Sequence, residues 1–300
     1  MMGAIAAAPL FPNHPLAASF VLMGSVLPDM DVLSGVFGRK TMMRFHQTVT
    51  HSVFGVVIAV ALCALLMLSL AREVPGAMFV ELALCPVTLG LGMCVHILTD
   101  WTNTFGVMWL APWRRERVCL EWVFFIDGFV IAANTLTLGL LAWSWSGPGA
   151  TLSWITVVHF TALAGYWAWR AWWRARAGRQ APEGTLSLVP SAIWPHRFYG
   201  CRLMEGGGVI ELFEWDALAG DLRGEPESLR LLDRRWKDAL DAIPEVGIMR
   251  ALSPAYFAIE EADGVVVCKD LRTRNFETSF GRLDLRVEED GGLSMERWYV

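Results

Sequence analysis

Residues 52–71 read SVFGVVIAVALCALLMLSLA, twenty consecutive positions without a charged side chain. A helix needs about 20 mostly apolar residues to cross the hydrocarbon core of a bilayer, so this segment predicts a membrane-spanning helix. The whole chain agrees, because 54% of its 300 residues are hydrophobic, only 18% are charged, and the mean hydropathy is positive. Soluble proteins of this length rarely have such a composition. We therefore expect an integral membrane protein.

Three more segments are long and apolar enough to predict spans. They are residues 77–99, 122–145 and 152–169. Residues 15–27 are apolar but short, and they predict a re-entrant or partly inserted helix. The predicted fold of residues 1–178 is thus an all-α multi-pass membrane helical bundle of four to five membrane helices.

The remainder of the chain, residues 181–300, has a different character. It holds 14 Lys/Arg and 22 Asp/Glu, against 11 and 8 in residues 1–180. Hydrophobic and polar residues alternate in 209–215 and 265–269, which is typical of strands, and residues 225–242 have the spacing of an amphipathic helix. We expect residues 181–300 to form a small soluble α+β domain that covers the site described below or binds a protein partner.

Basic residues are distributed unevenly among the predicted loops. Loops 28–48, 100–119 and 170–180 hold ten Lys/Arg, whereas the two loops on the opposite side hold only Arg72. Positively charged loops stay in the cytoplasm. The count places the three basic segments and the C-terminal domain on the cytoplasmic side of the inner membrane. Net charge is −5, which gives no sign of nucleic-acid binding.

Ionisable residues are costly in membrane segments and are functional by default. In this chain they gather at the predicted cytoplasmic ends of the helices. His96 and Asp100 are four residues apart, so on a helix they share a face. The set comprises Asp29, Asp31, His46, His51, His96, Asp100 and Asp127. Because all of them fall at one depth, segments distant in sequence are predicted to converge on one site.

Histidine nitrogens and carboxylate oxygens suit zinc, with manganese and ferrous iron as alternatives. The six cysteines contain no Cys-x-x-Cys pair, so a catalytic site is favoured over a closed structural one. The number of candidate ligands allows one or more ions. Asp31 is predicted as a ligand or general base, and Asp127 as a catalytic residue that supports or joins the site.

Simpler explanations exist for individual residues. Asp29 follows a proline and is able to cap a turn, and His46 is able to lie solvated at the interface. His96 with Asp100 is able to form a hydrogen-bonded clamp at a helix end. His159 lies in the middle of a predicted span and is expected to bond to a neighbouring helix.

The ordered motifs resemble a known family. They are LPDMD at 27–31, HQTVTHS at 46–52, HILTD at 96–100, TFG at 104–106 and LAPW at 110–113. Together they look like the LexA-regulated inner-membrane metal-dependent hydrolases, over roughly residues 10–130. That family is thought to be distantly similar to zinc-dependent phospholipase C and P1 nuclease, which implies a largely helical site and phosphoester substrates. Carried over by position, the resemblance implies metal ligation by His14, Asp29, Asp31, His46, His51, His96 and Asp100.

The chain departs from the family pattern at two places. Val32 stands where members often have histidine, and Gln47 with Thr48 stands where Arg-Gly is common. The expected function is a membrane-bound metal-dependent hydrolase, acting on a phosphoester of a membrane lipid or lipid-linked small molecule. The alternatives are a metal-binding transport or sensing protein, and a scaffold with a degenerate site.

Overall fold

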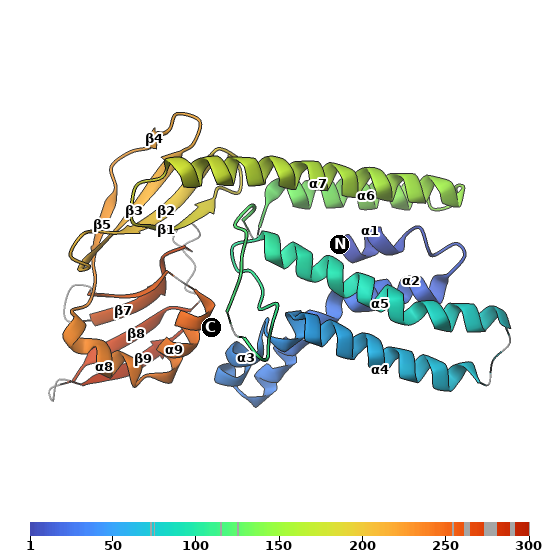
Figure 1. Cartoon of the computed structure of the whole chain (residues 1–300), viewed down its shortest axis with the longest axis horizontal. Helices are drawn as coiled ribbons and strands as arrows, with labels where there is room; N and C mark the ends of the chain where they lie inside the picture. Colours follow the sequence, from blue (N-terminus) through green and yellow to red (C-terminus); the bar gives the residue numbers. More distant parts are fainter. Residues whose placement is uncertain are drawn as a thin grey trace. The chain divides into compact units, whose positions relative to one another are not determined.

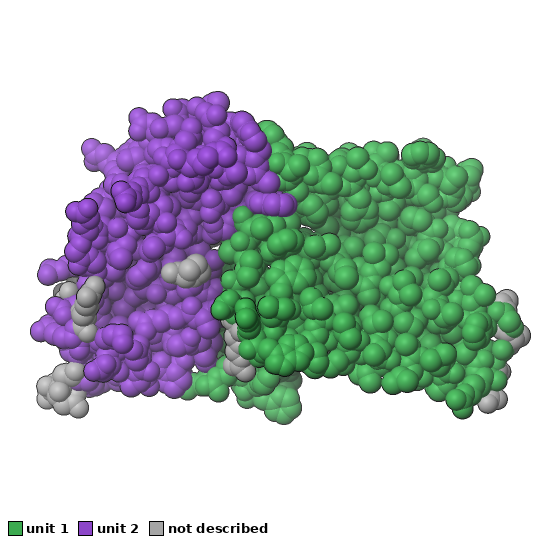
Figure 2. All heavy atoms as spheres, in the orientation of Figure 1, with its two compact units in different colours: residues 1–120, 125–169 green, residues 121–124, 170–300 purple. Residues whose placement is uncertain are grey.

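The computed structural model describes residues 1–72, 74, 76–114, 116–124, 126–253, 255–260, 265–272, 281–288 and 292–299 (Figure 1). The chain divides into two compact units, which Figure 2 colours green and purple. The first unit contains residues 1–120 and 125–169, and the second contains residues 121–124 and 170–300. The boundary falls within the long helix α7, Gly149–Gln180.

The first unit consists of helices joined by short connections and one longer segment. In chain order they are α1 Met2–Ala7, α2 Pro15–Val26, the 3-10 helix η1 Leu27–Phe37, α3 Arg39–Phe45, the 3-10 helix η2 Val49–His51, α4 Val53–Ala71, α5 Gly76–Thr102, α6 Gly128–Trp143 and the first part of α7. Helix α5 packs against both α2 and α4.

Among the described residues, three helical segments are long and apolar enough to cross a membrane. They are Pro15–Phe37, Val53–Ala71 and Met78–Thr102. The prediction of four to five spans in an all-α bundle was therefore overstated. Helix α6 has only 16 residues, and the apolar part of α7 is diluted by Trp, Tyr and His. The predicted re-entrant helix is instead the first candidate span, because η1 continues α2 to Phe37.

Two glycines allow α2 and α5 to approach closely. A Cβ atom at Gly24 would lie 2.1 Å from the carbonyl oxygen of Leu89, and one at Gly92 would lie 2.2 Å from that of Val21. Small residues permit such backbone contact between membrane helices. The close approach brings the last turns of α5 against the end of α2, where the polar residues of both helices lie.

Helices α6 and α7 are linked by polar side chains. Thr137 Oγ1 lies 2.9 Å from His159 Nδ1, which confirms the prediction of a helix-to-helix hydrogen bond for His159. Apolar residues of α1 join this pair, since Ile5 packs with Leu141 and Leu152.

The second unit contains two antiparallel sheets. The first sheet has the order β1-β2-β3-β4 with β5 also paired to β3, and the second has the order β6-β7-β8-β9. The strands are β1 Thr185–Pro190, β2 Arg197–Leu203, β3 Val209–Asp216, β4 Asp221–Leu222, β5 Glu227–Arg230, β6 Tyr256–Glu260, β7 Val265–Asp270, β8 Leu283–Val287 and β9 Leu293–Trp298. The alternating stretches 209–215 and 265–269 are thus confirmed as strands.

The single helix predicted for residues 225–242 was wrong. The structure has β5, then the 3-10 helix η3 Arg234–Trp236 and the short helix α8 Lys237–Asp241, followed by α9 Pro244–Leu252. Hydrogen bonds to β3 account for β5, because Ile210 and Leu229 are register partners. Pairing with a neighbouring strand has overridden the helical charge pattern.

Candidate metal centre

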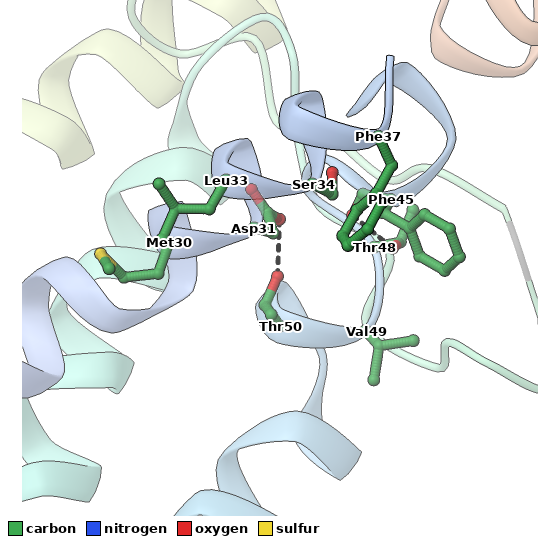
Figure 3. A pocket seen from close by; sticks show the side chains of 9 residues that line it. All are labelled: Met30, Asp31, Leu33, Ser34, Phe37, Phe45, Thr48, Val49 and Thr50. Carbon is green, nitrogen blue, oxygen red and sulfur yellow. Dashed lines mark hydrogen bonds between the residues drawn. The ribbon is translucent and has the colours of Figure 1, made fainter. Parts of the chain in front are cut away.

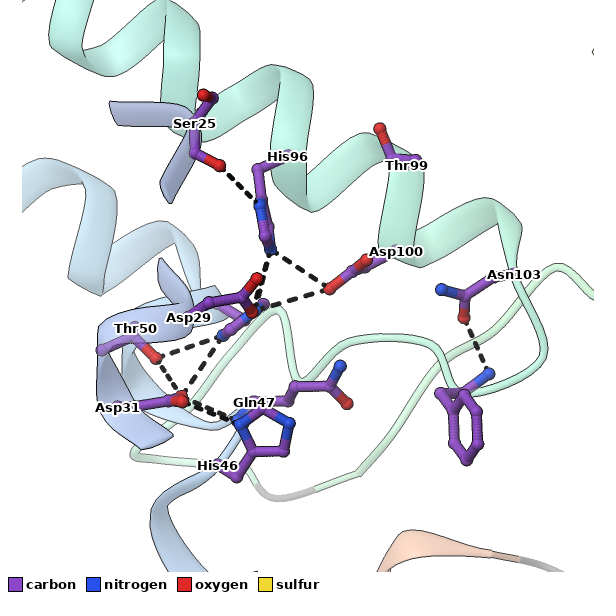
Figure 4. A network of polar contacts seen from close by, with 12 residues as sticks. Ser25, Asp29, Asp31, His46, Gln47, Thr50, His96, Thr99, Asp100 and Asn103 are labelled. Carbon is purple, nitrogen blue, oxygen red and sulfur yellow. Dashed lines mark hydrogen bonds and ion pairs between the residues drawn. The ribbon is translucent and has the colours of Figure 1, made fainter. Parts of the chain in front are cut away.

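Three segments of the first unit bring polar side chains to one place, where α2 ends, α4 begins and α5 ends. Asp29 and Asp31 come from η1, His51 from η2, and His96 with Asp100 from the last turns of α5. In Figure 4, Asp29, His96 and Asp100 point toward one another. We call His51, His96, Asp29, Asp100 and Asp31 the His/Asp cluster.

Local structure at the start of α4 fixes His51. Ser52 caps the helix, with its Oγ accepting from the backbone N–H of Gly55 at 3.1 Å. A Cβ atom at Gly55 would lie 2.1 Å from the carbonyl oxygen of Val49, so only glycine lets η2 pack on the first turn of α4. The His51 side chain is fully buried as a result.

The ligand-type atoms lie at metal-site spacing. His51 Nε2 and His96 Nε2 are 3.2 Å apart, and Asp29 Oδ1 is 3.4 Å from each of them. Asp100 Oδ2 is also 3.4 Å from both nitrogens, so two triangles share the His51–His96 edge. Ligands at about 2.0–2.1 Å from a tetrahedral zinc ion are about 3.3–3.4 Å apart. Two imidazoles and one carboxylate therefore match three corners of such a site, and the fourth corner is left for another ligand.

The other nitrogen of each ring is already committed. His96 Nδ1 lies 2.9 Å from the carbonyl oxygen of Ser25, and His51 Nδ1 lies 3.1 Å from Thr50 Oγ1 and 3.5 Å from Asp31 Oδ2. Histidines that bind metals through Nε2 commonly donate Nδ1–H to a carbonyl or carboxylate, which fixes the ring and the tautomer. This arrangement directs both Nε2 atoms to the same point.

Asp31 organises the segment that carries His51. Its carboxylate contacts His46 Nδ1 at 2.8 Å and accepts hydrogen bonds from the backbone N–H of Gln47 at 2.8 Å and from Thr50 Oγ1 at 2.7 Å. These contacts lie on the Nδ1 side of His51. The geometry thus places Asp31 and His46 behind the ligand atoms, as groups that orient His51.

The cluster is rich in negative charge. Burial alone would lower the pKa of His51, but the carboxylates of Asp100, Asp29 and Asp31 outweigh it and raise the pKa to about 10. Without a metal, His51 is therefore protonated at neutral pH. Three carboxylates around two imidazoles need a cation, and a proton or a divalent ion is able to supply the charge.

Two of the predicted site residues lie elsewhere in the first unit. His14 pairs with Glu81 at 2.9 Å, and both lie at the opposite ends of α2 and α5 from the cluster. Asp127 caps α6, since its Oδ1 accepts from the backbone N–H groups of Phe129 and Val130 at 3.1 Å each. Tyr166 donates to the same carboxylate. Neither His14 nor Asp127 shares the cluster, and helix capping accounts for Asp127.

Arg117 is connected to the cluster through one intervening residue, Gln47. Arg117 donates to Gln47 Oε1 at 2.7 Å, while the backbone of Gln47 bonds to Asp31. Arg117 entered the sequence prediction as one of the basic residues of loop 100–119. The sequence prediction included neither the Ser25 carbonyl, which has no residue signature, nor the Thr50 hydroxyl.

A family model described as YdjM inner membrane protein matches residues 1–174, more than half of the chain, including the entire cluster. The chain belongs to the YdjM inner membrane protein family. The family and the three apolar helices establish an inner-membrane location. The predicted resemblance to a LexA-regulated membrane family is confirmed at this level, whereas the likeness to metal-dependent hydrolases and phospholipase C stays a prediction.

A curated relative of this YdjM family chain is "Uncharacterized protein YfhP" of Bacillus subtilis (strain 168). The two are 26% identical over 223 residues, which cover 67% of this chain and 64% of the relative. The chain thus spans less than two thirds of that protein's length. No solved structure matches the chain.

Proposed function

We propose that this protein is a membrane-bound metal-dependent hydrolase that cleaves a phosphoester of a lipid or lipid-linked molecule at the membrane surface. The observation that carries the proposal is the pair of Nε2 atoms of His51 and His96, 3.2 Å apart and flanked by carboxylate oxygens. Phosphoester chemistry is suggested by the motif resemblance, and the lipid substrate by the membrane location.

The donor set fits a divalent ion, with zinc first and manganese or iron as alternatives. When bound, such an ion polarises a phosphoryl oxygen and lowers the pKa of water. His51, His96 and one carboxylate would hold it, because their atoms already form a triangle of the right size. The carboxylate left over, Asp29 or Asp100, lies within reach to accept a proton from attacking water. Asp29 is half exposed, so substrate is able to approach from its side.

The cytoplasmic orientation of the cluster and of the second unit belongs to the same proposal. It is supported by the six Lys/Arg of segments 28–48 and 100–119, which carry or adjoin the cluster residues, whereas residues 72–76 between α4 and α5 hold only Arg72. Green fluorescent protein fused after residue 300 should fluoresce, and alkaline phosphatase at the same position should be inactive. The reverse pattern would contradict the orientation. A protein partner of the second unit stays a prediction.

Hydrolysis of bis(p-nitrophenyl) phosphate by full-length protein in detergent tests the activity. Protein stripped with a chelator and reloaded with zinc should hydrolyse this phosphodiester. His96→Ala should lower the rate at least about 100-fold, because it removes a ligand. His196→Ala is the matched control, since His196 lies in the second unit and contacts Asp216. Bound metal without hydrolysis, or hydrolysis unaffected by His96→Ala, would favour the transport or sensing alternative instead.

A further inference from the structure

A cavity of about 390 Å³ lies beside the His/Asp cluster in the first unit (Figure 3). Its wall comes from η1, the end of α3 and η2. Apolar side chains make up most of it, namely those of Met30, Leu33, Phe37, Phe45 and Val49. Pockets for small ligands usually measure about 300–1,000 Å³ and have mostly apolar walls. The cavity is thus large enough for part of a ligand.

The cavity and the cluster share residues. Asp31 and Thr50 line the cavity, and Thr50 Oγ1 donates to Asp31 Oδ2 at 2.7 Å. The same carboxylate contacts His51 and His46. One end of the cavity therefore adjoins the cluster at Asp31, so a ligand with an apolar part here would have its next atoms near that residue.

The wall offers little to a polar ligand. The hydroxyl of Thr48 donates to the carbonyl oxygen of Phe45 at 2.6 Å, and that of Thr50 is used by Asp31. Ser34 Oγ is the wall atom that has no hydrogen-bond partner in the described part of the chain. A peptide or sugar would leave several of its own polar groups unpaired here, which is costly.

The rim of the cavity includes part of a candidate membrane span. Its helix η1 is the last part of the candidate span Pro15–Phe37. Phe37 is 81% exposed and Phe45 is 54% exposed, so aromatic side chains stand at the opening. Helix α3 adds the exposed basic residues Arg39 and Arg44. Apolar side chains beside basic ones are typical of a segment that lies among anionic lipid headgroups.

We propose that this cavity holds one hydrocarbon chain of a membrane phospholipid, so that the phosphoester of that lipid reaches the His/Asp cluster. The placement of the phosphoester rests on the proposed hydrolase function and deepens it by naming the substrate class. Binding of the hydrocarbon chain itself depends only on the apolar wall of the cavity, on its opening and on its being part of a candidate membrane span.

Photolabelling tests the cavity without requiring turnover. Full-length protein is reconstituted in phosphatidylethanolamine vesicles that contain phosphatidylglycerol with a diazirine in one acyl chain. After irradiation, labelled residues are mapped by mass spectrometry. Leu33, Phe45 and Val49 should carry at least about fivefold more label than Leu65, an exposed residue of α4 outside the cavity. Equal labelling at the two places would overturn the proposal.

Two tryptophan variants of the same helix refine the test. Leu33→Trp should fill the cavity and lower the label on Phe45 and Val49 at least about fivefold. Val36→Trp should leave it within about twofold, because Val36 is 84% exposed and does not line the cavity. Equal effects of both variants would also overturn the proposal. If Leu33→Trp does not fold, the wild-type map decides alone. Since labelling needs neither metal nor hydrolysis, its outcome is independent of the proposed activity.

Discussion

The two ends of α5 carry the same residue types in different arrangements. Near its start, Glu81 contacts His14 Nδ1 at 2.9 Å and accepts a hydrogen bond from the backbone N–H of Ala17 at 3.2 Å. Both carboxylate oxygens are used there by one histidine and one helix N-terminus. At the other end, His96 and Asp100 meet a second histidine and further carboxylates, and their ligand-type atoms lie at 3.2–3.4 Å from one another.

The difference shows what distinguishes a metal site from a structural pair. The Glu81 oxygens are occupied by protein donors, so this pair already satisfies itself. In the His/Asp cluster the ring Nδ1 atoms are occupied, whereas the two Nε2 atoms converge on each other and on the carboxylate oxygens of Asp29 and Asp100. Both ends of α5 combine histidine with a carboxylate residue. They differ in whether the side-chain nitrogen and oxygen atoms are already used by other protein groups.

Removing one imidazole of the His/Asp cluster should have the largest effect on zinc binding. In His51→Ala, bound zinc should fall from about one ion per chain to below about 0.1, because two ligands of a site of this kind cannot retain it through purification. Glu81→Gln should keep its zinc. Elemental analysis of detergent-purified proteins measures both. An equal loss in the two variants would mean that the ends do not differ as described.

Removing an orienting carboxylate should have a smaller effect. Asp31→Asn should weaken zinc binding about 10–100-fold, because Asp31 fixes His51 and the segment around it. Asp127→Asn is the matched control and should leave zinc affinity unchanged, since Asp127 caps α6. Competition with a chromogenic chelator gives both affinities. Weaker zinc binding in Asp127→Asn would contradict the assignment of Asp127 to helix capping alone.

The zinc affinity of the His/Asp cluster, at the end of α5, should increase with pH. The pKa of His51 is raised to about 10 from the ordinary 6.5, so the stabilisation from its ion pairs is fully present below pH 6.5 and is lost as pH rises through about 10. A metal must displace this proton. Zinc affinity should therefore increase up to about tenfold per unit between pH 6 and 8. The same chelator competition checks the slope, and an affinity that falls with pH would contradict the charge assignment.

Separating α2 from α5 should produce the smallest effect. Gly92→Ala places a Cβ against Val21 O, and the overpacking should cost about 1–3 kcal/mol and weaken zinc binding several-fold, since His96 would leave Ser25. Gly139→Ala in α6 meets nothing within 4 Å and should be neutral or slightly stabilising. Thermal unfolding followed by tryptophan fluorescence compares them. Equal melting temperatures would contradict the close packing.

Much of the cluster could be predicted from the sequence, because hydropathy fixes the ends of helices. Once residues 52–71 and 77–99 are taken as antiparallel neighbours, His51 and His96 must lie at the same end. The spacing of His96 and Asp100 then follows from the helix itself. What the sequence leaves out is which atoms are committed, since the Ser25 carbonyl and the contacts of Asp31 arise from tertiary packing.

Other predictions failed for physical reasons that can be named. A helix from His14 to Asp29 spans about 22 Å, so His14 meets Glu81 rather than the cluster. Trp173 follows the predicted span 152–169, a position typical of an interfacial aromatic residue, but it packs with Phe198 and Phe213 in the core of the second unit. Aromatic residues suit both a membrane interface and a protein core, and only the partner strands decide between them.

X-ray absorption at the zinc edge of the reconstituted full-length protein tests the central claim most directly. We predict a first shell of nitrogen and oxygen only, at about 2.0–2.1 Å, with the outer-shell scattering of two imidazoles. A sulfur shell at about 2.3 Å, or the absence of imidazole scattering, would contradict a metal centre built from His51, His96 and the neighbouring aspartates.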